Sequence, residues 1–156
     1  MSRFSKYAVA LALLGLSAPG SAQQTPHVMV LPEQIVWGPA SPKLPAGARM
    51  AVILGDPAKP GELYVFRAKL PDGYMVAPHT HPMDEHVTVI AGVMMLGFGE
   101  HRDEERMNEL PAGSFVTLPT GVPHYNRMRG ETILQFHGIG PYDIDYLNPA
   151  DDPRRR

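Results

Sequence analysis

Short apolar runs, separated by glycine and proline, dominate the chain from Arg49 onward. The runs are rich in β-branched and aromatic residues, and no helical period lies between them: RMAVILGD, ELYVFRAKL, HVTVIAG, VMMLGFG, SFVTLP and ETILQFHG. Within residues 63–70, apolar side chains from Tyr64 to Leu70 occupy every second position, and Arg67 and Lys69 lie between them. This alternation is typical of a strand with one buried face. We therefore predict an all-β sandwich or barrel.

The segments outside these runs predict a single barrel domain with extensions at both ends. Residues 23–48 contain too many prolines for a long helix, and we expect an extended arm. The barrel domain is predicted over 49–147 and a C-terminal tail over 148–156, of which the closing DDPRRR, residues 151–156, is expected to fray in solvent. The charged stretch 100–110 is expected to form a solvated loop with a helical turn. Trp37 is expected to pack on the barrel or on a neighbouring subunit rather than against a ligand.

The first 22 residues have the layout of a secretory signal peptide. Two basic residues precede an apolar run at 7–16, and Gly20 and Ala22 supply the small side chains that a signal peptidase needs. A retained membrane anchor is the weaker alternative, because the run is shorter than the roughly 20 residues that span a bilayer. We expect cleavage after Ala22 and export, so that the mature protein is periplasmic or secreted and has no membrane partner.

Composition narrows the possible partners. The chain has no cysteine, so disulfides and thiolate chemistry are excluded. Its formal charge is −2, with acids and bases interspersed, which disfavours nucleic acid as a partner. The exposed edges of a small barrel need cover, and the arm carries an apolar patch at Ile35, Val36 and Trp37. We therefore predict a homodimer in which the arm or an edge strand lies against the partner.

Histidines concentrate in the stretch HTHPMDEH, which runs from His79 to His86 in a chain with 7 histidines. On an extended strand, His79 and His81 point to the same side, so both imidazoles can reach one metal ion. A return strand beginning near Glu85 would place that carboxylate on the face of the apolar residues that follow it. His86 would then point the opposite way, and we interpret it as exposed.

This stretch resembles the first motif of the cupin superfamily. That motif contains a glycine, a His-x-His pair, a glutamate and a second glycine at fixed spacing, and Gly73, His79, His81, Glu85 and Gly92 satisfy it. The glycines have backbone roles, and Gly92 is expected to mark a junction between two strands.

The second cupin motif is matched by Gly113, Pro119, Gly121 and His124. The motif then ends on an asparagine, but this chain has Met128 there. Asn126 is the nearest asparagine, on the same strand face as His124. The resemblance implies a jelly-roll β-barrel that binds one divalent metal ion per chain through His79, His81, Glu85 and His124.

The chemistry of these ligands agrees with the resemblance. Three neutral imidazoles and one carboxylate leave a divalent ion with a net positive charge and with open coordination positions. The metal itself stays open among iron, manganese, nickel, copper and zinc. We predict that Asn126, Met128, Gln135 and His137 line the pocket beside it, although the face shared by Gln135 and His137 suits either pocket or surface.

These features favour a metal-dependent enzyme, a dioxygenase-like oxidoreductase acting on a small organic molecule. Members of the resembled superfamily also include isomerases and lyases, and fold alone does not choose among them. A non-catalytic metal-dependent binding or sensing module is the alternative, because the sequence identifies no acid, base or substrate clamp beyond the four ligands.

Overall fold

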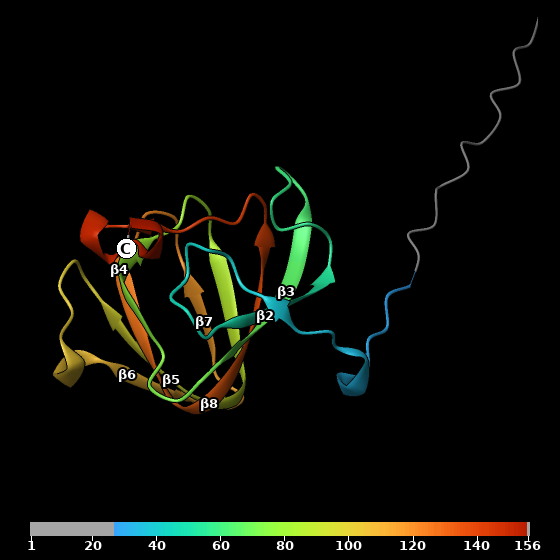
Figure 1. The fold of residues 1–156 in the computed structure, drawn as a ribbon, viewed down its shortest axis with the longest axis horizontal. Coiled ribbons are helices and arrows are strands. Elements are labelled where there is room, and N and C mark those ends of the chain that lie inside the picture. Colours follow the sequence, from blue (N-terminus) through green and yellow to red (C-terminus); the bar gives the residue numbers. More distant parts are fainter. Residues whose placement is uncertain (1–26, 156) are drawn as a thin grey trace, which may run out of the picture.

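A computed structural model describes residues 27–155 of the chain. The predicted signal peptide, residues 1–22, lies outside the described residues. One sheet of nine strands curls into a jelly-roll barrel (Figure 1), which confirms the predicted all-β fold. The strands are β1 (Gly38–Pro39), β2 (Arg49–Leu54), β3 (Leu63–Leu70), β4 (Met75–Thr80), β5 (Glu85–Phe98), β6 (Asn108–Pro111), β7 (Phe115–Leu118), β8 (His124–Ile139) and β9 (Asp145–Tyr146). No helix within the described range is long and apolar enough to cross a membrane.

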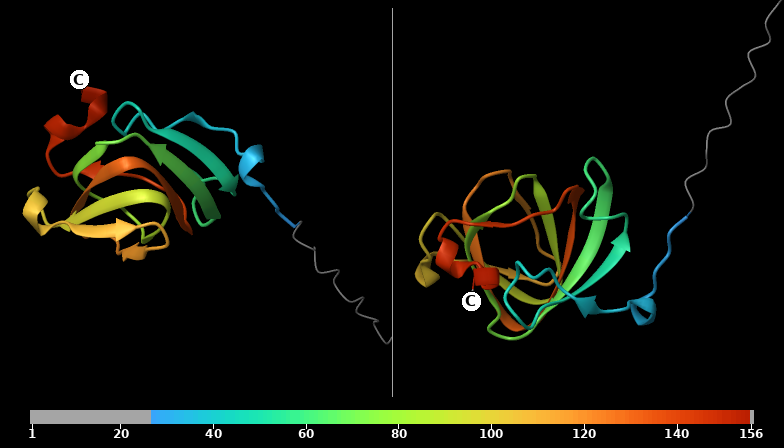
Figure 2. Two further views of the ribbon diagram at one scale, coloured as in Figure 1. Left: turned by 90° about the horizontal axis from the view of Figure 1, so that it is seen from below. Right: turned by 45° about the horizontal axis from the view of Figure 1, so that its top comes forward.

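The two longest strands, β5 and β8, organise the barrel. They pair antiparallel over most of their lengths, and β8 also pairs with β3 and β4. Gly92 does not separate two strands as predicted. It lies within β5, at a shift in the register with β8, and its φ of 75° lets the strand bend without ending. On either side of Gly92, β5 pairs with β7 over residues 85–88 and with β6 over residues 93–96, within the curled sheet seen in Figure 2.

The barrel interior is filled by the apolar face that the sequence pattern predicts. Tyr64, Phe66, Ala68 and Leu70 of β3 are all buried, in agreement with the alternation along this strand. Buried residues of β5 and β8 belong to the same core cluster as those of β3. The interior is thus mostly apolar, and buried histidines and a glutamate lie near one end of it.

The extensions at the two ends of the domain differ from each other. The arm contains the 3-10 turn η1 (Pro32–Gln34) and then the short strand β1, which pairs with β2. Trp37 lies against the barrel, where the Lys69 amino group sits 5.2 Å from its ring centroid. The tail does not fray as predicted. It forms two 3-10 turns, η3 (Pro149–Asp151) and η4 (Pro153–Arg155), and a buried Asp152 accepts hydrogen bonds from Arg154.

The charged loop contains the helical turn expected of it but is shorter than predicted, because residues 108–110 of the predicted loop belong to β6. This turn, η2 (Glu104–Arg106), is capped by the Asp103 side chain, which accepts a hydrogen bond from the Glu105 main-chain amide. Its three residues are exposed. The loop lies between β5 and β6 and has no residue in the barrel interior.

Candidate metal centre

Three histidines meet inside one end of the barrel. His79 is near the end of β4, and His81 directly follows that strand. His124 is the first residue of β8 and the cross-strand partner of His79. All three side chains are buried, and their ligand nitrogens lie within 4.8 Å of one another. They form the one group of three or more possible metal ligands in the part of the chain that the structure describes.

Backbone hydrogen bonds fix which nitrogen of each ring faces its neighbours. Nδ1 of His79 and of His124 contact the carbonyl two residues earlier at 2.8 and 3.0 Å, and Nδ1 of His81 contacts the Asp143 carbonyl at 2.5 Å. A carbonyl oxygen only accepts, so each Nδ1 donates. In the neutral ring, Nε2 is then an unprotonated acceptor. The three rings are therefore held as tautomers that bind metal through Nε2.

Burial keeps these rings neutral. Desolvation lowers the pKa of His79 well below its ordinary value, lowers that of His81, and lowers that of His124 to about 4. Repulsion between the neighbouring imidazoles acts in the same direction on His79 and His124. A cluster of neutral imidazoles at neutral pH is the state that a metal ion requires.

Glu85 brings a carboxyl group to the same place. Its side chain is buried at the start of β5, and its Oε2 lies 3.5 Å from Nε2 of His81. Desolvation raises the pKa of Glu85 to about 8. Since burial favours the neutral forms of both groups, this contact is not an ion pair in the metal-free protein. A divalent cation would reverse the balance, because it stabilises the carboxylate.

Unpartnered polar atoms test whether a metal ion fits. Glu85 Oε1 and His124 Nε2 are buried and have no hydrogen-bond partner among residues 27–155. Buried polar atoms without partners are rare, and they mark places where an ion, a water molecule or a ligand completes the structure. The set of three imidazoles and one carboxylate suits zinc, copper, nickel, iron or manganese. The residues present thus fit a divalent transition metal.

The cavity beside the cluster is small and mostly apolar. It has a volume of about 40 Å³, which leaves room for only a few water molecules. Asn126 and Met128 line it, as predicted. Asn126 Oδ1 is buried and is a further acceptor that lacks a partner within the described chain. The amide is therefore available to a ligand in the cavity.

The structure contradicts the prediction that Gln135 and His137 also line this pocket. Neither contributes to its wall, where Leu134 and Phe136 of the same strand take part instead. Gln135 accepts a hydrogen bond from Arg67 across the β3–β8 pair, and His137 contacts His86 on the outer face of the barrel. The reason is the two-residue period of β8, which turns odd-numbered residues outward in this part of the strand. His86 faces outward as predicted.

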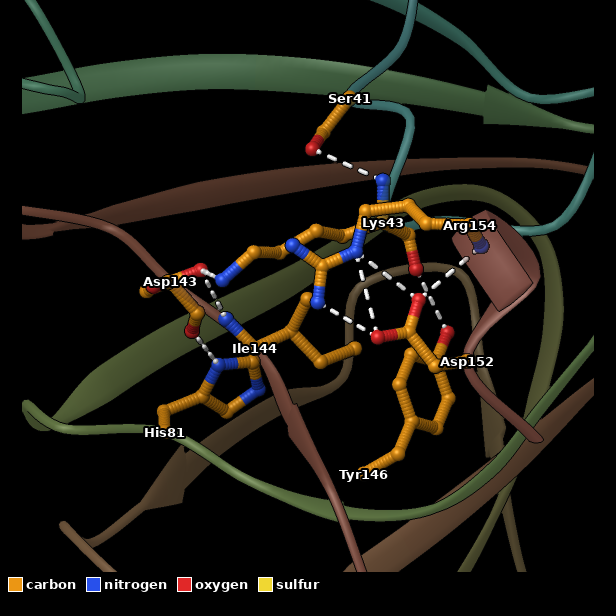
Figure 3. A network of polar contacts seen from close by, with 8 residues as sticks. All are labelled: Ser41, Lys43, His81, Asp143, Ile144, Tyr146, Asp152 and Arg154. Atoms are coloured by element: carbon orange, nitrogen blue, oxygen red, sulfur yellow. Dashed lines mark hydrogen bonds and ion pairs between the residues drawn. The ribbon is translucent and has the colours of Figure 1, made fainter. Parts of the chain in front are cut away.

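A network at the mouth of the barrel holds His81 in place (Figure 3). The Asp143 main chain accepts the bond from His81, and the Asp143 side chain forms an ion pair with Lys43 from the segment before β2. The Tyr146 hydroxyl donates to the Lys43 carbonyl at 2.8 Å. Segments from both ends of the domain therefore meet near His81 at the mouth of the barrel.

Two tyrosines near the cluster were not predicted as site residues. Tyr142 is near His81, with ring centroids 5.5 Å apart, and burial raises its pKa well above the ordinary value. Tyr64 has a buried hydroxyl with no partner in residues 27–155, and desolvation raises its pKa. The pattern of β3 predicts Tyr64 as core but does not reveal its hydroxyl, and Tyr142 lies in an irregular segment where periodicity indicates no direction.

The domain that contains this site matches a known protein family. Residues 29–155 match the family described as a domain of unknown function, DUF4437. The chain belongs to this family. A search of curated proteins gave no match. The match covers the barrel and most of the arm, so the DUF4437 domain includes all four of the predicted metal ligands.

Solved structures identify the fold of this DUF4437 chain as that of the cupins, since an RmlC-like cupin from Shewanella frigidimarina superposes with a TM-score of 0.55 at 16% identity, covering 82% of this chain and 97% of that one. The polyketide cyclase RemF from Streptomyces resistomycificus superposes with a TM-score of 0.65 at 16% identity, covering 80% of this chain and 88% of that one. A putative acetylacetone dioxygenase from Methylibium petroleiphilum gives 0.63 at 16% identity, with coverage of 84% and 88%. An acetylacetone dioxygenase from Acinetobacter johnsonii gives 0.62 at 15% identity, with 87% of each chain covered. At these identities the likeness establishes the fold alone.

Proposed function

We propose that this protein binds one divalent metal ion per chain through His79, His81, Glu85 and His124, and uses it as a dioxygenase-like oxidoreductase on a small organic molecule. The observation that carries the proposal is the convergence of three neutral histidines, each with Nδ1 bonded to a carbonyl, beside a buried carboxyl group. When bound, such an ion would supply Lewis acidity, or electron transfer to dioxygen if it is redox-active.

The residues around the cluster have separable roles. The carbonyl contacts hold the three imidazole rings in one orientation, and Glu85 offsets part of the ion's charge in an apolar interior. The Asn126 amide can hydrogen-bond a polar atom of the substrate, while Met128 presents an apolar wall. The pocket therefore favours a small molecule with oxygen atoms at one end and an apolar body, and it excludes most water from the reacting groups.

The solved neighbours support an enzyme but leave the reaction class broad. Two of the four are described as acetylacetone dioxygenases, one of them putative, another as a polyketide cyclase and the fourth as an RmlC-like cupin. The alternative function is a non-catalytic metal-dependent binding or sensing module. The small size of the cavity, about 40 Å³, favours this alternative.

Metal content and turnover test the proposal together. We expect one divalent ion per chain by elemental analysis of the purified protein, and loss of that ion in His81→Ala. His101→Ala, an exposed histidine in the charged loop, is the matched control and should retain the metal. Unchanged metal content in His81→Ala would remove the proposed site.

Substrate screening then separates the enzyme from the binder. The protein, loaded in turn with iron, copper, nickel, manganese and zinc, is incubated with small diketones, catechols, flavonols and hydroxy acids, with and without dioxygen. Consumption that requires dioxygen and is absent in His81→Ala supports the oxidoreductase. Binding by calorimetry without consumption under any condition supports the binding module instead.

Two further parts of the proposal concern assembly and location. The arm exposes apolar side chains, among them Met29 and Val36. We propose that the protein forms a homodimer in which the partner subunit covers them. Export to the periplasm or the outside of the cell rests on the sequence of residues 1–22 alone. In an exported protein the metal would be acquired after folding, from the metals available in that compartment.

A further inference from the structure

A second pair of histidines lies on the outer face of the barrel. His86 of β5 and His137 of β8 are direct partners in the register of the two strands. Their ring centroids are 5.0 Å apart, and the ring planes are inclined by 31°. Both side chains are partly exposed, and neither belongs to the cluster inside the barrel.

The outer pair repeats the geometry of a pair inside the barrel. His81 and His124, whose ligand nitrogens belong to the inner cluster, have centroids 5.2 Å apart and planes inclined by 33°. The separation of 5.0 Å between the outer rings is also that of His79 and His81. Two imidazoles at this spacing can therefore direct one nitrogen each to a common ion with bonds of about 2.0 to 2.1 Å.

The surroundings of the outer pair favour this use. The Thr117 hydroxyl lies 3.3 Å from Nδ1 of His86, which leaves the other nitrogen of that ring for a ligand. The Phe115 ring lies nearly parallel to both imidazoles, with centroids 6.2 and 6.3 Å away, and supports them from one side. Partial burial lowers the pKa of His137, which favours the neutral ring that binds metal.

The pair opens onto a hollow that has room for further ligands. This hollow has a volume of about 610 Å³ and is also lined by Asp84, Thr120 and Ile139. Asp84 accepts two hydrogen bonds from Thr120, so its position is fixed, and its negative charge favours a cation nearby. Water, or a small ligand, can reach an ion held at the histidines.

We propose that His86 and His137 form a second, exchangeable site for a divalent transition metal ion, of the kind that prefers imidazole: copper, nickel or zinc. The site is separate from the inner centre, because neighbouring residues of β5 serve opposite faces of one strand. Glu85 points into the barrel, and His86 points out of it. With two protein ligands in place of four, the outer site binds its ion more weakly than the inner one.

A copper titration tests the outer site in the full chain. The triple variant His79→Ala, His81→Ala and His124→Ala serves as the parent, so that the inner centre offers no imidazole that could compete. We expect one bound Cu²⁺ per chain, with nitrogen hyperfine coupling from two imidazoles in its electron paramagnetic resonance spectrum. Replacing His137 with Gln should raise the dissociation constant for Cu²⁺ at least about tenfold, because one of the two protein ligands is lost. The same change should remove one nitrogen from the hyperfine coupling.

Controls make the outcome decisive. His86→Gln repeats the test from the other strand, so the result does not depend on the folding of one variant, and melting curves identify variants that retain the barrel. His101→Gln removes an exposed histidine elsewhere and should leave the titration unchanged. Equal copper affinity and equal nitrogen coupling in His101→Gln, His86→Gln and His137→Gln would overturn the outer site. That result would leave the inner centre untouched.

Discussion

Glu85 illustrates, at the scale of a single residue, how a ligand position opposes the stability of the metal-free fold. Its side chain is buried at the start of β5, and its Oε1 atom has no hydrogen-bond partner within residues 27–155. An ionised carboxylate there is unfavourable unless a cation compensates it. The same burial that weakens the metal-free protein strengthens the attraction between this carboxylate and a divalent ion.

The raised pKa of Glu85 predicts how the stability of the metal-free protein depends on pH. Its folded pKa is about 8, against an ordinary value of 4.5, so the folded state retains the proton over that interval. The contribution of the protonated Glu85 to the free energy of unfolding is complete below about pH 4.5, and it is lost as the pH rises through about 8. Chelator-treated protein should therefore lose up to several kcal/mol of unfolding free energy over this window, relative to Glu85→Gln.

Urea denaturation at a series of pH values measures this difference. His124 acts in the opposite direction, because its pKa is lowered to about 4, so its contribution is lost as the pH falls from about 6.5. Glu85→Gln retains His124, so its stability should fall at acidic pH as that of the wild type does. Parallel stability curves for wild type and Glu85→Gln from pH 5 to pH 9 would show that the buried carboxyl is not the titrating group.

At the scale of strands, the sequence pattern predicts faces better than it predicts which face is inside. The alternation along β3 identifies its buried side, because apolar and charged residues alternate there. In β8 both faces carry apolar side chains, so Gln135 and His137 are not distinguished from pocket residues until β3 and β5 fix the register. The cluster of His79, His81, Glu85 and His124 was predictable because motif spacing sets strand ends and turns. The two tyrosines were not, since their positions depend on tertiary packing.

Gly92 lets β5 bend at one position, and a matched pair of variants tests this. Its φ is 75°, and a Cβ added there would lie 2.5 Å from the Glu131 carbonyl oxygen. Gly130 has a similar φ of 73° but open space around it. Gly130→Ala should cost about 1 to 2 kcal/mol from backbone strain alone, and Gly92→Ala should cost about 1 to 3 kcal/mol more from the clash.

Thermal unfolding of the two variants under the same conditions gives the comparison. The larger loss in Gly92→Ala should be accompanied by weaker metal binding, because the bend lies on the strand that begins with Glu85. Equal losses in the two variants would mean that β5 adjusts around the added methyl group, and that close backbone approach does not determine the bend.

At the scale of the whole molecule, chain segments far apart in sequence close the barrel over the histidines. Lys43 before β2 pairs with Asp143 after β8, and the Tyr74 hydroxyl donates to the Pro45 carbonyl at 2.8 Å. The arm and the C-terminal segment are therefore parts of one closure around the site. By contrast, the first part of the arm leads away from the barrel (Figure 1). Its apolar side chains have no comparable cover in the described chain.

This uncovered part of the arm predicts the assembly state. Met29 and Val36 are 83% and 86% exposed, and three neighbouring apolar residues are exposed as well. Such a cluster is stable in water when a second subunit covers it, so we expect a homodimer by light scattering at micromolar concentration. Deleting residues 23–40 should yield a monomer. The double substitution Met29→Ser and Val36→Ser keeps the arm and β1 in place, and it should shift the equilibrium toward monomer by removing apolar contacts alone. A dimer of unchanged mass in both variants would place the interface elsewhere on the barrel, and a monomeric wild type would exclude the dimer altogether.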